Sequence, residues 1–338
     1  MGSLAGGRPR SLKGEIVIEY LNNFPDTPSL TMAKMIYAEN KSLFTDEEDA
    51  RGTVRYYRGS YGEKQRYGKL FDFDGKYNPF GKLPEGLTDF KDWEPYPLDC
   101  KKALVLGDVH IPYHDRGALE IALEYGYAQG IDTLIFAGDF ADHFSISRWE
   151  KDPRRKDFNA EIETVYSILT TIREAFPDHQ IIWKIGNHEE RYVSYMEVKA
   201  PEMLGVKQFE FRNIFSLDHF NIQSITDKRI MKIGRLNVIH GHEFGKGFSS
   251  SVNPARGLYL KGKENAICGH LHRTSNHSEN SMNDSFTGCW SIGCLCDLHP
   301  RYLPINAWNW GFGVVEKFCE KEFQVHNKKI LNGKVYSA

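Results

Sequence analysis

The stretch TLIFAGDFAD, residues 133–142, decides the fold class. It is an apolar run of strand length that ends at Gly138, and the carboxylates Asp139 and Asp142 follow. Short apolar runs bounded by glycine are typical of buried strands. Glycine also lets the backbone turn sharply and approach a bound group closely. The stretch therefore predicts a buried strand that delivers acidic side chains at its carboxyl end.

Four further apolar runs end at polar residues, and in three of them a glycine directly precedes the polar residue, the exception being the run that ends at His240: KALVLGDVH (102–110), QIIWKIGNHEE (180–190), LNVIHGHEF (236–244) and NAICGHLH (265–272). Helical patterns at 115–130 and 160–178 separate the first three runs of the chain, which predicts an α/β fold. In open α/β sheets, ligands bind beyond the carboxyl ends of the strands. We therefore expect one crevice that collects the polar residues of these ends: Asp108, His110, Asp139, Asn187, His188, His240, His270 and His272.

The donors in this set are oxygens and imidazoles, without a thiolate. Such donors suit manganese, iron, zinc or nickel ions better than a structural zinc cage. They are too many for one ion and suit two, if one carboxylate bridges. Two ions about 3.5–4 Å apart are the usual clamp for phosphoester hydrolysis. The alternative is a sheet whose strand ends happen to be polar. Cys294 and Cys296 lack a second pair, and we expect them to be buried structural thiols.

The five motifs GDVH, GDFAD, GNHEE, IHGHEF and GHLH, in this order, resemble those of the calcineurin-like metallophosphoesterase superfamily. They span residues 102–275, and they are similar to those of phage and prophage members and of DNA-repair-type nucleases. The resemblance implies a four-layer α/β/β/α sandwich of two mixed sheets. Three C-terminal runs (285–295, 310–318 and 322–336) alternate like antiparallel strands, and we expect them to complete the second sheet.

The resemblance also implies roles for single residues. His188 would orient the phosphate or protonate the leaving group. Apart from the resemblance, Arg191 lies three residues after His188, and we expect it to clamp the phosphate, with a surface ion pair as the alternative. Asp142 would orient a ligand through a hydrogen bond. The cofactor would be two divalent ions, manganese first, with iron, zinc, nickel or magnesium as alternatives. The implied ligands are Asp108, His110 and His272 for one ion, Asn187, His240 and His270 for the other, and Asp139 as the bridge.

The chain divides into four parts by residue composition and pattern. We expect a flexible Gly-rich tail (1–10), a helical module (11–60), a linker rich in Gly, Pro, Tyr and Asp (61–100) and the metallophosphoesterase domain (101–338). The module contains three short helices with a tight turn, and it resembles a helix-turn-helix. Thr31 is expected to cap the second helix, residues 45–48 to form a capping box for the third, and Gly59 to end it.

Three arginines on the third helix, Arg51, Arg55 and Arg58, are spaced to share a face, and two tyrosines lie beside them. This combination predicts contacts with the phosphates and bases of DNA, with RNA as an alternative. The other interpretation is a small capping domain whose arginines pair with an acidic surface. The sequence leaves the oligomeric state open, a dimer included.

The leading hypothesis is a two-metal phosphodiesterase that cleaves DNA, with a metal-bridging hydroxide as nucleophile. The alternative is a phosphatase or small-molecule phosphodiesterase acting on nucleotides or phosphoproteins. A third hypothesis is a DNA-binding or structural protein whose metal site has lost its activity.

The 338 residues are 41% apolar with a net charge of −2, which excludes a uniformly basic surface. No secretory signal or apolar run of about 18 residues occurs, so we expect no membrane contact and a cytoplasmic location, in the host if the chain is phage-encoded.

Overall fold

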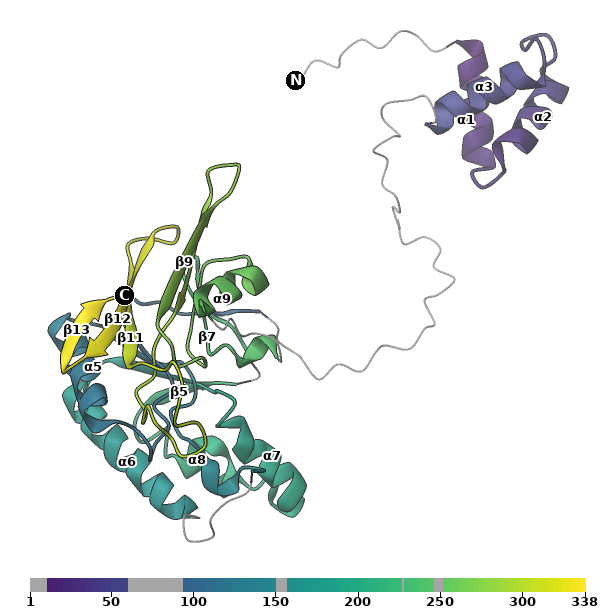
Figure 1. Cartoon of the computed structure of the whole chain (residues 1–338). Helices are drawn as coiled ribbons and strands as arrows, with labels where there is room; N and C mark the ends of the chain where they lie inside the picture. Colours follow the sequence, from purple (N-terminus) through teal and green to yellow (C-terminus); the bar gives the residue numbers. More distant parts are fainter. Residues whose placement is uncertain (1–10, 60–93, 150–156, 227, 246–251) are drawn as a thin grey trace. The chain divides into compact units, whose positions relative to one another are not determined.

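The computed structural model describes residues 11–59, 94–149, 157–226, 228–245 and 252–338. The chain forms two compact units, residues 1–87 and 88–338, and each is described by itself (Figure 1). The expected tail at 1–10 and most of the expected linker lie outside the described residues. The domain boundaries proposed from the sequence therefore stay a prediction.

The first unit contains the three expected helices: α1 (Leu12–Asn23), α2 (Ser29–Glu39) and α3 (Glu47–Arg58). Gly59 ends α3 in the left-handed conformation, as expected, with φ 98°. The cap expected from Thr31 is wrong, because α2 starts after Pro28 and Thr31 lies inside the helix. Asp46 caps α3 by accepting a hydrogen bond from the backbone N–H of Asp49 at 2.8 Å. The helices enclose a small core of their own: Val17, Met32, Ala33, Ile36, Phe44, Ala50 and Val54.

The second unit contains a seven-stranded mixed sheet. Its central strands β2 (Lys102–Leu106), β3 (Thr133–Phe136), β4 (Gln180–Lys184) and β5 (Ile222–Ile225) are parallel neighbours. Beyond β2 the sheet continues with antiparallel pairs, formed by β11 (Gly311–Lys317), β12 (Phe323–Leu331) and β13 (Lys334–Ser337). The apolar runs that begin at 102, 133 and 180 thus lie side by side, as the sequence predicts.

A six-stranded mixed sheet faces it. The strand order is β1 (Tyr96–Pro97), β6 (Met231–Ile233), β7 (Leu236–Ile239), β8 (Ala266–Cys268), β10 (Phe286–Ser291) and β9 (Ser275–Asn280). The parallel neighbours β7 and β8 carry the fourth and fifth motifs at their ends. Tyr96 pairs with Met231, so the last residues of the expected linker belong to this sheet.

The expectation that all three C-terminal runs complete the second sheet is wrong in part. Only β10 joins that sheet, beside β8. The runs that form β11–β13 extend the first sheet instead, and Val314 of β11 pairs with Leu104 of β2. Alternating apolar residues specify a half-buried strand but not its neighbour, because either sheet offers an equivalent face.

Three apolar layers hold the second unit together, and they produce the expected four-layer sandwich. Helices α5 (Arg116–Ala128) and α6 (Phe158–Ala175) cover the outer face of the seven-stranded sheet (Figure 1). Helix α9 (Pro254–Gly262) covers the six-stranded sheet. Between the sheets, Val105 and Ile135 pack in one cluster with Val238 and Ile267. The shorter elements are α7 (Glu190–Lys199), α8 (Phe211–Ile214), η1 (Phe144–Ile146), η3 (Pro201–Met203), η4 (Lys207–Phe209) and η5 (His242–Phe244).

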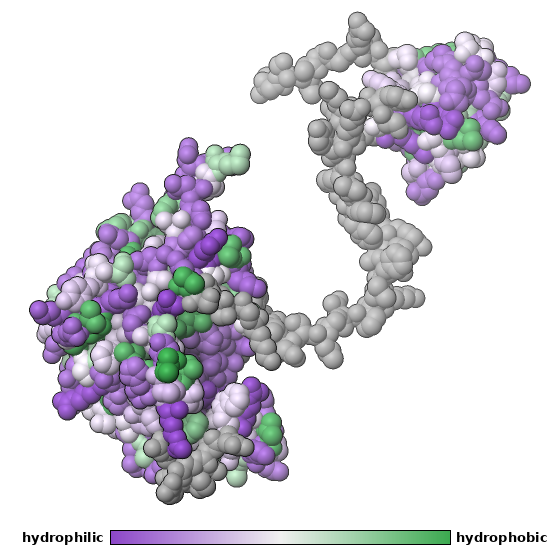
Figure 2. Space-filling view, viewed as in Figure 1, coloured by the Kyte–Doolittle hydropathy of each residue, from purple (hydrophilic) through white to green (hydrophobic). Residues whose placement is uncertain are grey.

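The surface shown in Figure 2 is mainly hydrophilic, with hydrophobic residues scattered over the second unit. Single exposed apolar side chains are normal in globular proteins. Within the part of the chain that the structure describes, no helix has the length and apolar character needed to cross a bilayer.

Candidate metal centre

Five of the expected ligands occupy strained backbone positions directly after their strands. Asp108, Asp139 and His270 have φ of 55°, 53° and 68°, and His110 and His272 both have φ of 52°. The left-handed region is uncommon for residues with a side chain and costs on the order of 1–3 kcal/mol each. Such strain persists only where the surrounding structure imposes it, and it gathers at functional sites.

Glycines beside the ligands make room for this crowding. A Cβ atom at Gly138, where φ is +96°, would lie 2.4 Å from Nδ1 of His240. One at Gly186 would lie 2.3 Å from an oxygen of Asp139, and one at Gly269 would lie 2.6 Å from an oxygen of Asp108. The glycines at these three positions are therefore needed for the close approach of another motif.

Two of the histidines, His240 and His110, have Nδ1 anchored and Nε2 directed into the cluster. Nδ1 of His240 is 2.9 Å from the carbonyl of Ala137, and Nδ1 of His110 is 2.7 Å from Oδ1 of Asp142. The Nε2 atoms of His110 and His272 face each other at 3.1 Å. A proton on Nδ1 leaves the Nε2 lone pair for a metal ion. The second motif's Asp142 thus orients His110, as expected.

Asp139 lies at the centre of the cluster. Its Oδ2 is 3.1 Å from Nε2 of His240 and 4.0 Å from Nε2 of His110, which belong to the two different ligand groups. Its Oδ1 accepts the backbone N–H of His188 at 2.8 Å. Asp139 can therefore share its carboxylate between two ions.

Asp108 supplies the test of whether a cation fits. Its Oδ2 accepts the backbone N–H of His270 at 2.8 Å. Its Oδ1 faces Nε2 of His272 at 3.3 Å, yet it is buried and has no well-formed hydrogen bond among the described residues. A buried carboxylate oxygen left in this way is costly unless a cation compensates it. On the other side, Oδ1 of Asn187 is 3.1 Å from Nε2 of His240.

The charge balance of the cluster also favours cations. Burial alone would lower the pKa of His240, but the carboxylate of Asp139 outweighs it and raises the pKa to about 10. Asp108 outweighs burial in the same way at His272, whose pKa is also raised to about 10. Without metal, the carboxylates therefore hold protons on two imidazoles. Metal ions at these positions would displace those protons.

His188 and Arg191 lie together at the edge of this cluster. Nε2 of His188 is 3.7 Å from Oδ2 of Asp139, and its Nδ1 is 3.0 Å from Oδ1 of Asp142. Arg191 donates from Nη1 to the carbonyl of Asp142 at 2.8 Å and from Nη2 to Nε2 of His188 at 2.7 Å. Because the guanidinium can only donate, Nε2 of His188 accepts, and the ring is neutral in this state.

Two buried carboxylates that the sequence analysis passed over shape the turns. Glu189 accepts backbone hydrogen bonds from the second and third motifs. Glu243 accepts from the backbone of His240 at 3.0 Å and of Gly241 at 2.6 Å, and it pairs with the buried Lys184 at 2.8 Å. Glu189 follows the motif residue His188 by one residue, and Glu243 follows His240 by three. An acidic residue this close to a motif histidine is the sequence feature that could have indicated their role.

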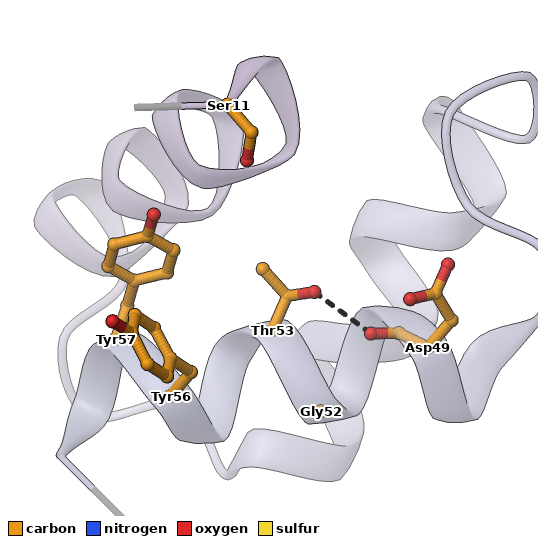
Figure 3. Close-up of a pocket in the computed structure, with 6 residues that line it drawn as sticks. All are labelled: Ser11, Asp49, Gly52, Thr53, Tyr56 and Tyr57. Carbon is orange, nitrogen blue, oxygen red and sulfur yellow. Dashed lines mark hydrogen bonds between the residues drawn. The ribbon is translucent and has the colours of Figure 1, made fainter. Parts of the chain in front are cut away.

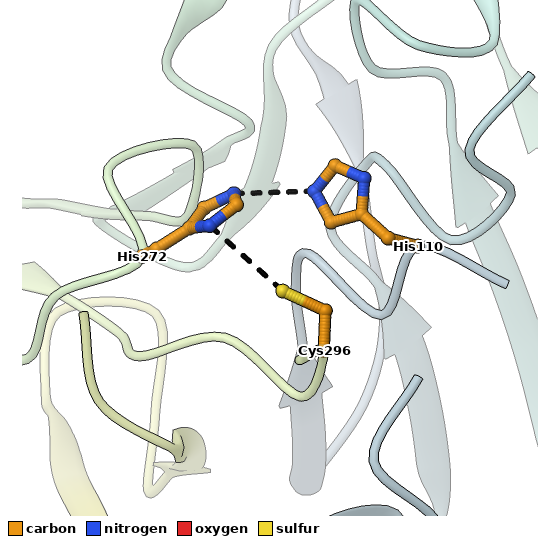
Figure 4. A group of neighbouring side chains, drawn as sticks. All are labelled: His110, His272 and Cys296. Atoms are coloured by element: carbon orange, nitrogen blue, oxygen red, sulfur yellow. Dashed lines mark hydrogen bonds between the residues drawn. The ribbon is translucent and has the colours of Figure 1, made fainter. Parts of the chain in front are cut away.

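The structure also adds a thiol to the cluster. Sγ of Cys296 is 3.9 Å from Nδ1 of His272, on the side of the ring opposite His110 (Figure 4). His110, His272 and Cys296 have ligand atoms close enough to hold one ion. The expectation of oxygen and imidazole ligands stays a prediction, and Cys296 is buried, as expected. The sequence does not indicate this contact, because 24 residues separate Cys296 from His272.

All five motif turns lie within residues 101–282, and a family model described as calcineurin-like phosphoesterase matches this range, more than half of the chain. The chain belongs to the calcineurin-like phosphoesterase family. The buried His/Asp cluster fits a binuclear metal site, and the chain is a metal-dependent phosphoesterase. The family expected from the motifs is thus confirmed, while the role of each ligand stays a prediction.

Relatives of this calcineurin-like phosphoesterase occur in mycobacteriophages. The Gene 54 protein of phage L5 is 27% identical over 180 residues, which cover 51% of this chain and 69% of the phage protein. The Gene 54 protein of phage D29 is 26% identical over 181 residues, with the same coverage. The likeness to phage members expected from the motifs is therefore present, and that to DNA-repair nucleases stays a prediction.

Among solved structures, Vps29 of Entamoeba histolytica complexed with zinc is 13% identical and has a TM-score of 0.35, covering 70% of this chain and 97% of its own. Yfce, a phosphoesterase from E. coli, is 14% identical with a TM-score of 0.32 and covers the same shares. These similarities are too low to carry an argument about substrate.

In the helical unit, the three arginines of α3 differ in what they contact. Arg51 pairs with Glu48 at 3.2 Å. Arg58 donates to the carbonyls of Pro25 and Thr27 and to Oγ of Ser29, so it ties the start of α2 to α3. The side chain of Arg55 has no hydrogen bond or ion pair within the described residues. Nearby, a hollow shown in Figure 3 is lined by Ser11, Asp49, Gly52, Thr53, Tyr56 and Tyr57.

Proposed function

We propose that this calcineurin-like protein uses two divalent ions, manganese first, to hydrolyse phosphodiester bonds in DNA. The observation that carries the proposal is the position of Asp139, between the two groups of expected ligands. Bound ions would neutralise the phosphate and lower the pKa of a water nucleophile. The proposed ligands are Asp108, His110 and His272 for one ion, Asn187, His240 and His270 for the other, and Asp139 for both.

Around that centre, the chain's own residues would bind the phosphate and supply a proton. When Arg191 turns to a phosphate oxygen, it releases Nε2 of His188, which it now occupies at 2.7 Å. The negative charge of the bound diester raises the proton affinity of the freed ring. Nε2, freed from Arg191, would take up a proton from solvent, and His188, held through Nδ1 by Asp142, would give this proton to the leaving oxygen.

Two features of the helical unit support DNA as the substrate. Arg55 has no partner among the described residues of its unit, and Tyr56 next to it is 52% exposed. An uncommitted arginine beside an exposed aromatic ring is suited to a phosphate and a base. We propose that Arg55 contacts DNA, with smaller contributions from Arg51 and Arg58, which already have partners.

A second candidate function is hydrolysis of small phosphoesters. The described helical unit, residues 11–59, has six basic and eight acidic side chains, so it is not a basic surface overall. Affinity for DNA depends mainly on phosphate neutralisation. An acidic balance therefore favours a phosphatase or small-molecule phosphodiesterase, and the experiment must separate the two.

The test is hydrolysis by the full-length, manganese-loaded chain of labelled DNA, labelled RNA, bis-p-nitrophenyl phosphate and p-nitrophenyl phosphate. The proposal expects cleavage of DNA and of the small diester. His188→Ala should lower DNA cleavage by about 10²–10⁴-fold. It should affect the p-nitrophenyl diester less, because p-nitrophenolate leaves without needing a proton. Cleavage of the monoester alone would support the phosphatase, and cleavage of RNA alone would replace DNA by RNA.

Arg55→Ala tests the role of the helical unit, with Lys34→Ala as the matched control. Lys34 is an exposed cation on α2, a different helix from the one that carries the three arginines. If α3 contacts DNA, Arg55→Ala weakens DNA binding and reduces its salt dependence, while Lys34→Ala does neither. Equal effects of the two substitutions would show nonspecific electrostatics.

A further inference from the structure

The loop 297–309 is fixed beside the proposed metal centre at both ends. The backbone N–H of Asp297 donates to the carbonyl of Tyr113 at 2.9 Å. The backbone N–H of Asn309 donates to the carbonyl of His272 at 3.0 Å, and Nε1 of Trp310 donates to the carbonyl of Cys296 at 2.9 Å. The loop is therefore positioned by the same segments that position one expected ligand.

Hydrogen bonds inside the loop give it a defined shape. Nδ2 of Asn306 donates to the carbonyls of Leu298 at 2.7 Å and Leu303 at 2.8 Å. Oδ1 of Asn306 accepts the backbone N–H of Trp308 at 2.9 Å. One side chain thus joins three points of the loop, and the aromatic residues it carries are held in place before any substrate arrives.

Two aromatic rings of this loop lie next to the cluster. The ring of Trp308 is 4.1 Å from that of His272, centroid to centroid, with 58° between the planes. Tyr302 meets Trp308 edge-on at 6.3 Å. The Trp308 ring therefore stands against an expected metal ligand, and Tyr302 extends this aromatic surface outward.

Tyr302 offers most of its surface to solvent. Its exposed fraction is 73%, and that of Ile305 in the same loop is 91%. Partial desolvation, and after it the carboxylate of Asp142, raise the pKa of the phenol above its usual range. An exposed ring that meets Trp308, which itself stands against the expected ligand His272, is suited to contact what is attached to a bound phosphate.

We propose that Tyr302 and Trp308 form a stacking platform for the nucleobase next to the scissile phosphate. The proposal rests on the proposed diesterase function and narrows its substrate to esters with a planar aromatic group on the phosphate that is cut. Every base has a π-face, so such a platform selects nucleotides over alkyl esters without reading sequence.

The test compares two diesters with the same leaving group, thymidine 5′-(p-nitrophenyl phosphate) and methyl p-nitrophenyl phosphate, using the full-length, manganese-loaded chain. We expect kcat/KM for the thymidine ester to be about 10-fold higher or more, mainly through KM, as for one stacked base. In Tyr302→Leu this ratio falls toward one, and in Tyr302→Phe it is kept. Tyr336→Leu on β13, which removes another exposed tyrosine, leaves both rates unchanged.

A binding measurement separates failure of the platform from failure of the diesterase. Calorimetry compares thymidine 5′-phosphate with methyl phosphate on the same metal-loaded proteins. If neither ester is hydrolysed but the nucleotide binds more tightly and Tyr302→Leu removes that difference, the platform stands and the diesterase proposal fails. If wild type shows no preference for the nucleoside in rate or binding, or if the preference survives Tyr302→Leu, the platform is overturned.

Discussion

The carboxylate of Glu189 accepts the backbone N–H of Asp139 at 3.0 Å, and so joins the third motif to the second. The same carboxylate accepts from Phe140 at 2.7 Å, Ala141 at 3.0 Å and Gly186 at 2.8 Å. Burial raises the pKa of this carboxyl, yet both oxygens face N–H donors, which requires the ionised form. Glu189 therefore fixes the turn that presents the proposed bridging ligand.

Glu189→Gln should weaken both folding and metal binding. The amide nitrogen cannot accept, so about half of these buried N–H groups lose their partner, at roughly 1–3 kcal/mol each. We expect the free energy of unfolding to fall by about 2–5 kcal/mol and metal affinity by about 10–100-fold. Urea unfolding and calorimetric metal titration measure these changes. Glu174→Gln, on the exposed face of α6, is the control. A variant that binds metal like wild type would show that this turn needs no such support.

Gly138→Ala should disturb His240 directly. The new Cβ would lie 2.4 Å from Nδ1 of that ring, in a backbone conformation with φ +96°. Gly130→Ala is the matched control, because its φ is +63° and nothing lies within 4 Å of a Cβ there. We expect about 1 kcal/mol of destabilisation at Gly130 and several kcal/mol at Gly138, with weaker metal binding only at Gly138. Thermal unfolding with and without manganese checks this, and equal losses would contradict it.

Asp108→Asn should remove one bound ion. The substitution takes away the charge of the buried carboxylate whose Oδ1 has no well-formed hydrogen bond among the described residues. We expect elemental analysis to find one tightly bound manganese per chain in the variant and two in wild type. Diester hydrolysis should fall by about 10³-fold, the scale of a lost charge-stabilising group. Asp178→Asn, on the surface after α6, should change neither value. Two ions retained in Asp108→Asn would remove Asp108 from the ligand set.

Glu161 should make stability fall as the pH rises. Its Oε1 accepts the backbone N–H of His143 at 2.7 Å, and burial raises its pKa from 4.5 to about 8. Between those two values the unfolded chain releases the proton while the folded chain keeps it. The free energy of unfolding therefore decreases with pH in this window, by at most about 1.4 kcal/mol per pH unit from this group. Glu161→Gln keeps the acceptor and should remove that part of the slope, which urea titrations from pH 5 to 8 with chelator can measure. Parallel slopes for the two proteins would show that Glu161 ionises normally.

Arg58→Ala should destabilise the helical unit, whereas Arg55→Ala should not. Arg58 bonds the backbone carbonyls of Pro25 and Thr27 and the hydroxyl of Ser29. Losing hydrogen bonds from a charged donor costs about 1.5–3 kcal/mol. Hydrogen exchange of residues 11–59 in the full-length chain should accelerate in Arg58→Ala alone. Acceleration in both variants would mean that α3 needs both arginines for folding.

Much of the fold and of the candidate site follows from the sequence, because each motif is local. The run before Asp139, its glycine and its carboxylate are specified within ten residues, and the same holds for the other four motifs. Parallel pairing then places the ends of β2, β3 and β4 together in one sheet and those of β7 and β8 together in the other. Strand periodicity and glycine stops were therefore enough for the strands and their polar ends, whereas the four layers were expected from the family resemblance, and the packing of the two sheets brings the two groups of ends together.

Only the tertiary structure decided which partners meet across long stretches of chain. The alternation of apolar and polar residues in β11 does not determine that Val314 pairs with Leu104, because the strand could equally join the other sheet. Nor does a pair of cysteines show that Cys296 lies next to His272. Glu189 satisfies N–H groups 48 to 50 residues away, and Arg58 is held by carbonyls of another helix's start. Local sequence determines which backbone conformation a segment adopts, whereas the partner of a buried polar or apolar group is set by the packing of the whole unit, which no local pattern encodes.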